Sequence, residues 1–345
     1  MATGSSELRK SIRIGVLGAG SWGTALSQHL ARKGYTLDLL VHEPDVKDQI
    51  QQLKENKSFF PGVKLSERIV ASNDGETVVG NKNFIVVVVP SHVLRETASR
   101  VAPFVSKDAI VVSASKGIEI KTHLTMSGVL REVFGHVSPE RIGALSGPSF
   151  AREVARGLPT LVTVAFTSQE LAETAQEVFA TPSFRVYTNQ DLMGVELGGS
   201  VKNVMAIAAG ISDGLGLGSN TRAALITRGL TEIRRLGVHL GADPRTFSGL
   251  AGVGDLVLTC TDDQSRNHTL GKKIGRGMKL DEILAEMRMV AEGVRTARSL
   301  YNLSRNVGVE MPIALQVYRI LYEGVEPMKA LRSLMTRSLR DELEE

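Results

Sequence analysis

The fold is decided by residues 12–23, which read Ile-Arg-Ile-Gly-Val-Leu-Gly-Ala-Gly-Ser-Trp-Gly. The apolar run at the start of this stretch predicts a short buried strand. It leads directly into Gly18, Gly20 and Gly23, which have the spacing G-x-G-x-x-G, and apolar side chains at helical spacing follow. In this context the first glycine permits a tight turn, the second lets the backbone approach a pyrophosphate, and the third lets the helix pack on the strand. The stretch therefore predicts a dinucleotide-binding turn.

The rest of the first half alternates between apolar runs and helical patterns. Strands that are apolar throughout and that alternate with helices indicate a parallel sheet covered on both faces. We therefore expect a Rossmann-like, doubly wound α/β domain over residues 12–190, preceded by a flexible polar tail over residues 1–11. The expected strands are Ile12–Leu17, Thr36–Val41, Phe84–Val89, Ala109–Ser113, Arg141–Leu145, Thr160–Ala165 and Arg185–Tyr187, and the expected helices include Trp22–Lys33, Asp45–Leu53 and Gln169–Ala180.

From about Asp191 the alternation stops and the pattern becomes helical. Asp243 followed by Pro244 predicts an N-cap and the first residue of a helix. Further helices are expected over Glu292–Asn306, Pro312–Tyr322 and Pro327–Arg337. Residues 191–345 are therefore expected to form an all-α domain that carries the substrate and the catalytic groups.

Composition excludes several classes of protein. Of the 345 residues, 41 are basic and 37 acidic, giving a net charge of +4. The basic residues are scattered and aromatics are 5%, which argues against a nucleic-acid binder.

The chain has a single cysteine, Cys260, so an internal disulfide is ruled out and a reducing cytosol is favoured. We expect this cysteine to be structural. No apolar run is long enough for a membrane span. The seven histidines show no metal-ligand spacing, so no metal site is expected.

Several polar residues lie where the carboxyl ends of strands are expected, which is where open α/β sheets bind ligands. Glu43 stands 20 residues after Gly23, beside His42, and a carboxylate there would accept from a ribose 2′-hydroxyl and oppose a 2′-phosphate. This favours NAD without excluding NADP. Lys116 follows one strand, and the segment Ser146-Gly147-Pro148-Ser149 follows another, so both are candidates to meet an anion.

The helical half offers a second group of candidates. Lys202 stands on an otherwise apolar helix, and a lysine in such surroundings can act in proton transfer. The preceding Gly198 and Gly199 are expected to leave room for a flat ring or a substrate. Arg266, flanked by Ser265 and Asn267 at an expected helix start, is suited to grip a phosphate.

These motifs resemble, in one order over almost the whole chain, those of bacterial NAD(P)-dependent glycerol-3-phosphate dehydrogenases. The resemblance implies a cytoplasmic enzyme that reduces dihydroxyacetone phosphate to sn-glycerol 3-phosphate, the precursor of membrane glycerophospholipids. It implies that Lys202 donates and accepts the proton. The stretches that carry it are GAGSWGTA at 18–25, SKG at 115–117, SGPS at 146–149, KN at 202–203, GDL at 254–256 and SRN at 265–267.

The resemblance also assigns the binding residues. Those for the substrate are Lys116, Gly147, Ser149, Lys202, Asp255, Ser265, Arg266 and Asn267. For NAD(H) or NADP(H) it adds, to the Gly18, Gly20, Gly23 and Glu43 already expected from the motif and spacing, the residues Ser21, Trp22, His42, Lys116, Ala151, Arg266, Val290 and Glu292. His42 departs from the family pattern, because many members carry at its position an arginine that would favour a 2′-phosphate.

Two other interpretations remain open from the sequence. One is a reductase of the hydroxyacid or ketopantoate type, which would lack a phosphate grip such as Arg266 and Asn267. The other is a redox-sensing module that binds NAD(H) without chemistry and has no need for a lysine on an apolar helix. The oligomeric state also stays open, with a homodimer as one alternative.

Overall fold

The protein is described by a computed structural model that covers residues 11–287, 291–339 and 341–342. It divides into two compact units, the first comprising Met1–Lys116 and Met126–Val195 and the second Gly117–Thr125 and Glu196–Glu345. The sequence had suggested a single boundary near residue 190 and did not separate the short 117–125 segment. Hydrogen bonds attach that segment to the second unit: Ser200 Oγ donates to the Gly117 carbonyl at 3.2 Å, and Ser299 Oγ to the Ile118 carbonyl at 2.8 Å. The expected tail over 1–11 lies, apart from its last residue, outside the described residues.

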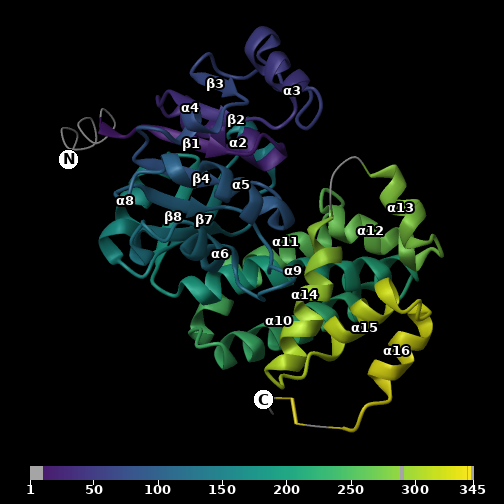
Figure 1. Cartoon of the computed structure of the whole chain (residues 1–345). Helices are drawn as coiled ribbons and strands as arrows, with labels where there is room; N and C mark the ends of the chain where they lie inside the picture. Colours follow the sequence, from purple (N-terminus) through teal and green to yellow (C-terminus); the bar gives the residue numbers. More distant parts are fainter. Residues whose placement is uncertain (1–10, 288–290, 340, 343–345) are drawn as a thin grey trace. The chain divides into compact units, whose positions relative to one another are not determined.

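The first unit is built on one eight-stranded sheet with the order β3-β2-β1-β4-β5-β6-β7-β8. The order reverses between β1 and β4, so the glycine-rich turn after β1 lies at the switch point of a doubly wound sheet, as expected. The strands β3, β2, β1 and β4 can be followed in this order in Figure 1. The strands are β1 (Ile14–Leu17), β2 (Leu37–Leu40), β3 (Ile69–Ser72), β4 (Phe84–Val87), β5 (Ile110–Ser113), β6 (Ile142–Ser146), β7 (Thr160–Ala165) and β8 (Phe184–Asn189).

The expectation of a wholly parallel sheet is wrong at one place. Strands β6 and β7 pair antiparallel, whereas every other neighbouring pair is parallel. The link between them, residues 147–159, holds only the six-residue helix α7 (Ala151–Arg156), and such a short link returns the chain in the opposite direction beside the strand it has left. Strand β3 was not expected, because its second and fourth side chains are not buried and no long apolar run marks it.

Helices connect the strands of the sheet. Both faces of the central strands are buried. Strands β1, β4 and β5 are buried along their whole length, which explains their continuous apolar sequences. The helix expected over Asp45–Leu53 is instead a short α-helix followed by a π-helical turn, Gln49–Leu53. The α-helices of this unit are α2 (Ser21–Arg32), α3 (Pro44–Asp48), α4 (Gly75–Val79), α5 (Leu94–Val101), α6 (Met126–Val133), α7 and α8 (Gln169–Phe179).

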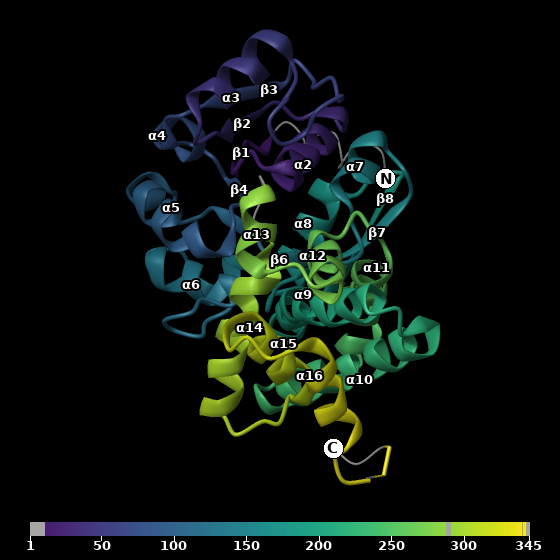
Figure 2. The same ribbon diagram turned by 90° about the vertical axis from the view of Figure 1, so that its right-hand side faces the viewer.

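The second unit is helical, as expected. Asp243 accepts from the Arg245 backbone N–H as a cap, but Pro244–Ser248 forms a short 3₁₀ helix rather than the start of an α-helix. Figure 2 shows α14, α15 and α16, which contact one another in sequence order. The helices are α9 (Leu192–Gly214), α10 (Gly218–His239), α11 (Asp255–Thr261), α12 (Arg266–Gly275), α13 (Leu280–Glu286), α14 (Glu292–Asn306), α15 (Pro312–Tyr322) and α16 (Pro327–Met335).

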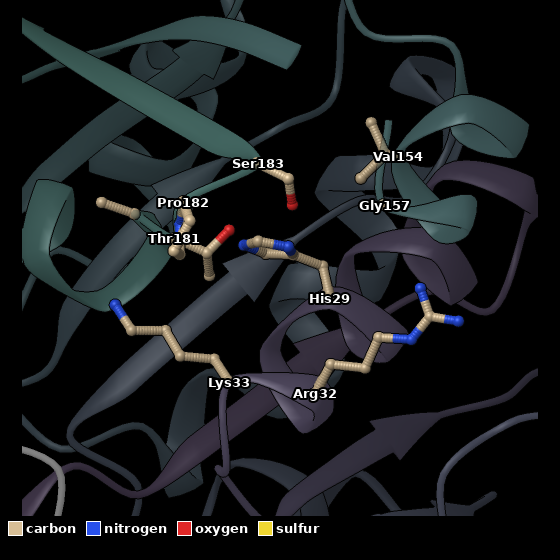
Figure 3. Close-up of a pocket in the computed structure, with 9 residues that line it drawn as sticks. His29, Arg32, Lys33, Val154, Gly157, Thr181, Pro182 and Ser183 are labelled. Atoms are coloured by element: carbon tan, nitrogen blue, oxygen red, sulfur yellow. The ribbon is translucent and has the colours of Figure 1, made fainter. Parts of the chain in front are cut away.

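A pocket of about 290 Å³ in the first unit marks where three helices of that unit end (Figure 3). The last carbonyls of a helix lack partners within it, and three basic side chains from the end of α2 satisfy such carbonyls of α7 and α8. The bonds run from His29 Nε2 to the Phe179 carbonyl at 2.6 Å, from Arg32 to the Ala155 carbonyl and from Lys33 to the Glu177 carbonyl. The basic character of this pocket therefore serves the fold, because the negative ends of helices disfavour an anion there.

We expect His29 to make folding stability pH-dependent. Burial, reinforced by Lys33 and Arg32, lowers the pKa of His29 from 6.5 to about 4, so between these values the unfolded chain binds a proton that the folded chain does not. Stability should therefore fall as the pH drops from about 6.5 to about 4, by on the order of 3 kcal/mol from this residue. His29→Gln keeps an N–H for the Phe179 carbonyl and does not titrate, so urea unfolding should show a flatter pH dependence.

The comparison of His29→Gln with the wild type is needed because another group acts in the opposite sense. Burial raises the pKa of Glu232 to about 7, so its contribution is lost as the pH rises through that value. This contribution is common to both proteins and cancels in their difference. Parallel pH profiles for the two proteins would contradict the prediction for His29.

Candidate functional site

The glycine-rich turn after β1 has the geometry of a phosphate cradle. Gly18 has a φ of +115°, in the left-handed region that favours glycine, and a Cβ on Gly23 would lie 1.9 Å from the Gly18 carbonyl oxygen. A Cβ on Gly20, in contrast, would meet no protein atom within 4 Å. Helix α2 begins after Gly20 with no side-chain cap and no acidic residue in its first turn. The open space over Gly20 and the helix N-terminus beside it fit the pyrophosphate of a dinucleotide.

The residues around this turn are held by packing. Ser21 donates its hydroxyl to the Phe59 carbonyl at 2.7 Å. Trp22 and Ala151 pack against the same small buried cluster of Ala25, Phe60 and Ala155, so the structure brings together two residues assigned to the cofactor from distant parts of the chain. The indole Nε1 of Trp22 is buried and has no hydrogen-bond partner in the described structure. A buried N–H of this kind is an orphan that a bound ligand can satisfy.

His42 and Glu43 follow the end of β2, the strand next to β1. The Gly18 N–H donates to the carbonyl of Leu40, the last residue of β2, at 3.2 Å, which ties the glycine turn to this strand end. His42 is exposed, whereas Glu43 is half-buried and stands at the N-cap position of α3 without capping it through its side chain. Both therefore stand near the expected ribose end of the cradle.

Lys116 and the Ser146–Ser149 segment meet after the neighbouring strands β5 and β6. Lys116 Nζ lies 3.4 Å from the Gly147 carbonyl, and Ser149 Oγ donates to the same carbonyl at 2.9 Å. Gly147 has a φ of +132°, and a Cβ on it would lie 3.0 Å from Val162 Cα. The hydroxyl of Ser146 is buried and has no hydrogen-bond partner in the described residues. The three candidates Lys116, Gly147 and Ser149 thus form one polar group at the carboxyl edge of the sheet.

Lys202 is the buried cation of the second unit. It lies on α9 with 6% of its surface exposed, and its ammonium is paired with the carboxylate of Asp255, which is 1% exposed. Nζ also donates to Thr259 Oγ1 at 2.7 Å, and that hydroxyl donates to the Asp255 carbonyl at 2.6 Å. Asp255 and Thr259 are one turn apart on α11, so the helix presents both to the lysine. This arrangement holds the ammonium of Lys202 inside the unit against one face of α11.

A close backbone contact positions α11 beside Lys202. A Cβ on Gly198 would lie 2.4 Å from the Ala251 carbonyl oxygen, because the turn Leu250–Gly254 that leads into α11 passes directly over α9. The expectation that Gly198 leaves room for a ring or a substrate is therefore wrong, since protein backbone fills that room. The glycine instead lets Asp255 approach Lys202.

The start of α12 places the expected phosphate grip beside the lysine helix. Ser265 caps α12 by accepting from the His268 N–H at 3.2 Å, and its own hydroxyl proton stays available as a donor. Asn267 Oδ1 accepts from the Gly293 N–H at 3.0 Å. A Cβ on Gly293 would lie 2.7 Å from both Asn267 Oδ1 and the Asn203 carbonyl, so the residues that follow Arg266 and Lys202 lie close together.

The electrostatics of this region suit an anion. Because the Asn267 amide oxygen is engaged by an N–H, its remaining polar group is the NH₂ donor. Arg266 is exposed, yet burial around its guanidinium lowers the pKa, and the carboxylate of Glu292 at the start of α14 opposes that shift. Val290, also expected at the cofactor, lies outside the described residues.

Other groups are not suited to chemistry. Burial raises the pKa of the Cys260 thiol to about 12, so it is protonated and unreactive at neutral pH. Within the described residues no set of three His, Cys, Asp or Glu side chains is arranged to hold a metal ion. No helix in the described ranges has the length and hydropathy to cross a membrane.

Comparisons with known proteins decide the family. The family model described as NAD-dependent glycerol-3-phosphate dehydrogenase N-terminus matches residues 13–172, and the C-terminus model of the same family matches residues 191–332. The chain belongs to this family. Its members include "Glycerol-3-phosphate dehydrogenase [NAD(P)+]" of Syntrophobacter fumaroxidans, 55% identical over 96% of this chain and 97% of that protein, and that of Citrifermentans bemidjiense, 54% identical over 96% and 98%.

Solved structures support the same placement. The crystal structure of glycerol-3-phosphate dehydrogenase from Coxiella burnetii is similar with a TM-score of 0.91 and 41% identity, over 95% of this chain and 99% of that one. A ketopantoate reductase from Ralstonia eutropha has a TM-score of 0.58 and 15% identity, over 93% and 100% of the two chains, which shows a shared fold alone. The expected fold class, a Rossmann-like sheet followed by a helical domain, is confirmed for this member of the dehydrogenase family.

Sequence reasoning assigned no contact to Thr259 or Gly293, and it noted Asn203 only as part of the KN motif at 202–203. Thr259 gave no signal of its own, because a threonine inside a helix is common. Its position one turn after Asp255 was the one feature that could have pointed to it. Asn203 and Gly293 act through backbone proximity, which no single-residue pattern reveals. The expected residues Lys202 and Asp255 are in direct contact, and Arg266 and Asn267 follow one another at the start of α12.

Two glycine variants should separate cofactor binding from folding in this dehydrogenase. Gly20→Ala adds a methyl group to open space at an ordinary φ, so unfolding stability should change by less than about 1 kcal/mol. The same methyl group occupies the space expected for the pyrophosphate, so the Kd for NADH should rise at least about tenfold, or about 1.4 kcal/mol. Fluorescence titration with NADH and thermal unfolding measure the two effects.

Gly23→Ala is the matched control, because its methyl group would collide with the Gly18 carbonyl. It should lower the unfolding temperature strongly, whether or not a cofactor is added. Unchanged NADH affinity in Gly20→Ala would contradict the placement of the pyrophosphate over this turn.

Proposed function

We propose that this protein reduces dihydroxyacetone phosphate to sn-glycerol 3-phosphate, reversibly, with NADH or NADPH, and so supplies the backbone of glycerophospholipids. The observation that carries the proposal is the buried Lys202, held by Asp255 and Thr259 beside the start of α12. A protein that only bound a dinucleotide would have no use for a buried cation with an anion grip next to it. The family relationship supports the same activity.

The cofactor fits the residues of the first unit. The open space over Gly20, the uncapped start of α2 and the orphan Nε1 of Trp22 all favour a bound dinucleotide. A bound nicotinamide supplies the hydride that the ketone carbon receives. Glu43 would accept from the ribose hydroxyls of NADH, whereas exposed His42 offers less attraction to a 2′-phosphate than an arginine would. We therefore propose a preference for NADH.

Lys202 would supply the proton. As the carbonyl carbon gains a hydride, its oxygen gains negative charge, and the ammonium of Lys202 both stabilises this charge and donates the proton that completes the alcohol. In the reverse reaction the neutral amine accepts the hydroxyl proton. Asp255 and Thr259 act on the lysine, since their bonds to Nζ restrict its position and orientation.

The substrate phosphate takes no part in the bond changes and would serve as a handle. Arg266 provides a planar set of donors, Asn267 its NH₂ group and Ser265 its hydroxyl proton. The family resemblance supports Lys116, Gly147 and Ser149 as further substrate residues. Contacts to a group that does not react can be used to position the carbonyl for reaction.

The proposal includes a cytoplasmic location, small-molecule substrates as the partners, and no binding of nucleic acid. The lone, buried Cys260 agrees with a reducing compartment. A homodimer stays one alternative for the assembly, to be decided by sedimentation.

Initial rates with dihydroxyacetone phosphate test the function directly. We expect turnover with both cofactors and a higher kcat/KM with NADH than with NADPH. Stoichiometric NADH binding without turnover would favour a sensing module instead. Turnover of ketopantoate but not of the phosphorylated ketone would favour a reductase of that type.

Removing the ammonium of Lys202 should abolish turnover. Lys202→Met alone would leave the buried Asp255 carboxylate without its partner, which typically costs about 3–5 kcal/mol of stability. The double variant Lys202→Met/Asp255→Asn removes both charges and should fold. Its kcat should fall by at least roughly 10²–10⁴-fold, the range of acid–base catalysis. NADH affinity and circular dichroism should stay close to the wild type, and a kcat above about a tenth of wild type would exclude Lys202 from the mechanism.

Arg266→Ala should impair the phosphorylated substrate selectively. Loss of a charge-assisted contact of about 2–4 kcal/mol corresponds to a decrease in kcat/KM for dihydroxyacetone phosphate of roughly 30- to 1,000-fold. The low activity with unphosphorylated dihydroxyacetone should change little. Arg276→Ala removes an exposed arginine at the other end of α12 and should leave both values unchanged. Equal losses on the two substrates would show that Arg266 does not bind the phosphate, and NADH affinity must be measured because Arg266 is also assigned to the cofactor.

A further inference from the structure

Helices α9 and α12 cross in backbone contact, and glycines on both helices make this contact possible. Gly210 and Gly214 are one turn apart on α9, as are Gly271 and Gly275 on α12. A Cβ on Gly210 would lie 2.1 Å from the His268 carbonyl oxygen, and one on Gly271 would lie 2.3 Å from the Ile207 carbonyl oxygen. A Cβ on Gly275 would lie 2.4 Å from the Ile211 carbonyl oxygen. The two helices, seen in Figures 1 and 2, therefore approach each other without intervening side chains.

Such a contact sets how closely the helices approach, because each glycine faces a backbone oxygen of the other helix. Interlocking side chains normally set the rotation and the axial position of packed helices, and a glycine surface offers few of them. The register matters here because α9 carries Lys202 and α12 begins with Arg266 and Asn267. A small slide of α12 along α9 would move the phosphate grip relative to the proton donor.

One buried polar side chain at the crossing ties the two helices together. His268, the residue after Asn267, is 2% exposed, and its Nε2 lies 2.9 Å from Oδ2 of Asp213 near the end of α9. Asp213 is held in turn by Arg222 of α10, whose Nη1 donates to the same oxygen at 3.0 Å. On the other side of the ring, His268 Nδ1 lies 3.4 Å from Oδ1 of Asp263. Lys272 Nζ lies 2.8 Å from the same oxygen.

The imidazole thus lies between two carboxylates from different segments, each held by a cation of its own. A carboxylate oxygen only accepts hydrogen bonds, so Nε2 is the donor to Asp213, whereas Nδ1 has no hydrogen-bond partner within the described residues. A buried ring that is hydrogen-bonded to Asp213 of α9 resists sliding of the helix that carries it. Neither Asp213 nor His268 belongs to the groups already assigned to substrate or cofactor.

We propose that His268 is a positioning residue: through Asp213 it sets the register of α12 on α9 and so holds Arg266 and Asn267 at the correct place relative to Lys202. The proposal rests on the function proposed above. His268 touches no reacting atom, so its effect should be specific to binding of the phosphate end and not to cofactor binding. A displacement of about 1 Å in a catalytic site can reduce rates about 100-fold.

The test uses His268→Gln, which keeps a polar side chain and one N–H for Asp213, and His268→Leu, which keeps only the bulk. For His268→Leu we expect the KM for dihydroxyacetone phosphate to rise at least about tenfold, with a smaller decrease in kcat. The KM for NADH and the activity on unphosphorylated dihydroxyacetone should stay within about twofold of wild type. His268→Gln should recover most of the lost affinity.

Two further variants make the outcome decisive. Asp213→Asn removes the charge of the anchor at constant size and should reproduce the KM effect, which keeps the test valid if His268→Leu fails to fold. Lys273→Met breaks the ion pair of α12 with Glu286 of α13 and should leave every kinetic constant unchanged.

The possible results separate the two proposals. A lower unfolding temperature with unchanged KM values in His268→Leu and Asp213→Asn would show a merely structural role and overturn the positioning proposal. Equal losses for the phosphorylated and unphosphorylated ketone would overturn it as well. A wild-type protein without turnover on dihydroxyacetone phosphate would instead overturn the proposed function.

Discussion

The burial of one charge, the ammonium of Lys202, is the constraint on which the arrangement of the second unit depends. A lone ammonium inside an apolar helix bundle would be too costly, so it requires an anion and further hydrogen bonds at close range. Asp255 and Thr259 supply them from one face of α11. For α11 to begin there, the preceding turn must pass over α9 at backbone distance, which only a residue without a side chain at position 198 allows. The buried charge thus determines where a neighbouring helix starts.

The same logic extends to α12 and α14 through backbone contacts. Gly210 and Gly271 bring α12 against α9, and Gly293 brings the start of α14 against both. At each of these places a glycine replaces a side chain where a polar group must come within reach of another helix. These glycines are therefore parts of the site, although none of them carries chemistry.

The sequence predicted those features that local rules determine. The G-x-G-x-x-G turn after β1 has the expected strand before it and the expected helix after it, because the pattern of apolar residues and the conformational needs of Gly18 are local. The strand β7 was predicted with its observed bounds, but its antiparallel direction was missed, since strand direction depends on the length of the link. The strand β3 was missed because it lacks a continuous apolar run. Lys202 stood out as a charge among apolar residues, whereas Thr259 did not stand out. The use of Gly198 was misjudged because its neighbour, the 250–254 turn, is distant in sequence.

The polar clusters of this protein differ in which of their polar groups are already hydrogen-bonded within the protein, and that difference separates function from architecture. At the end of α2, three basic side chains donate to backbone carbonyls of helix ends, so they stabilise the fold and are poorly placed to attract an anion. At the start of α12 the engaged group of Asn267, as far as the described residues show, is its acceptor, Oδ1. By the proposed function its donor would meet the ligand. A structural hydrogen bond to the Gly293 N–H therefore sets the polarity of the site. An asparagine turned the other way would present oxygen to a phosphate and repel it, so in the proposed function the N-terminal turn of α14 sets which group of Asn267 the phosphate would meet.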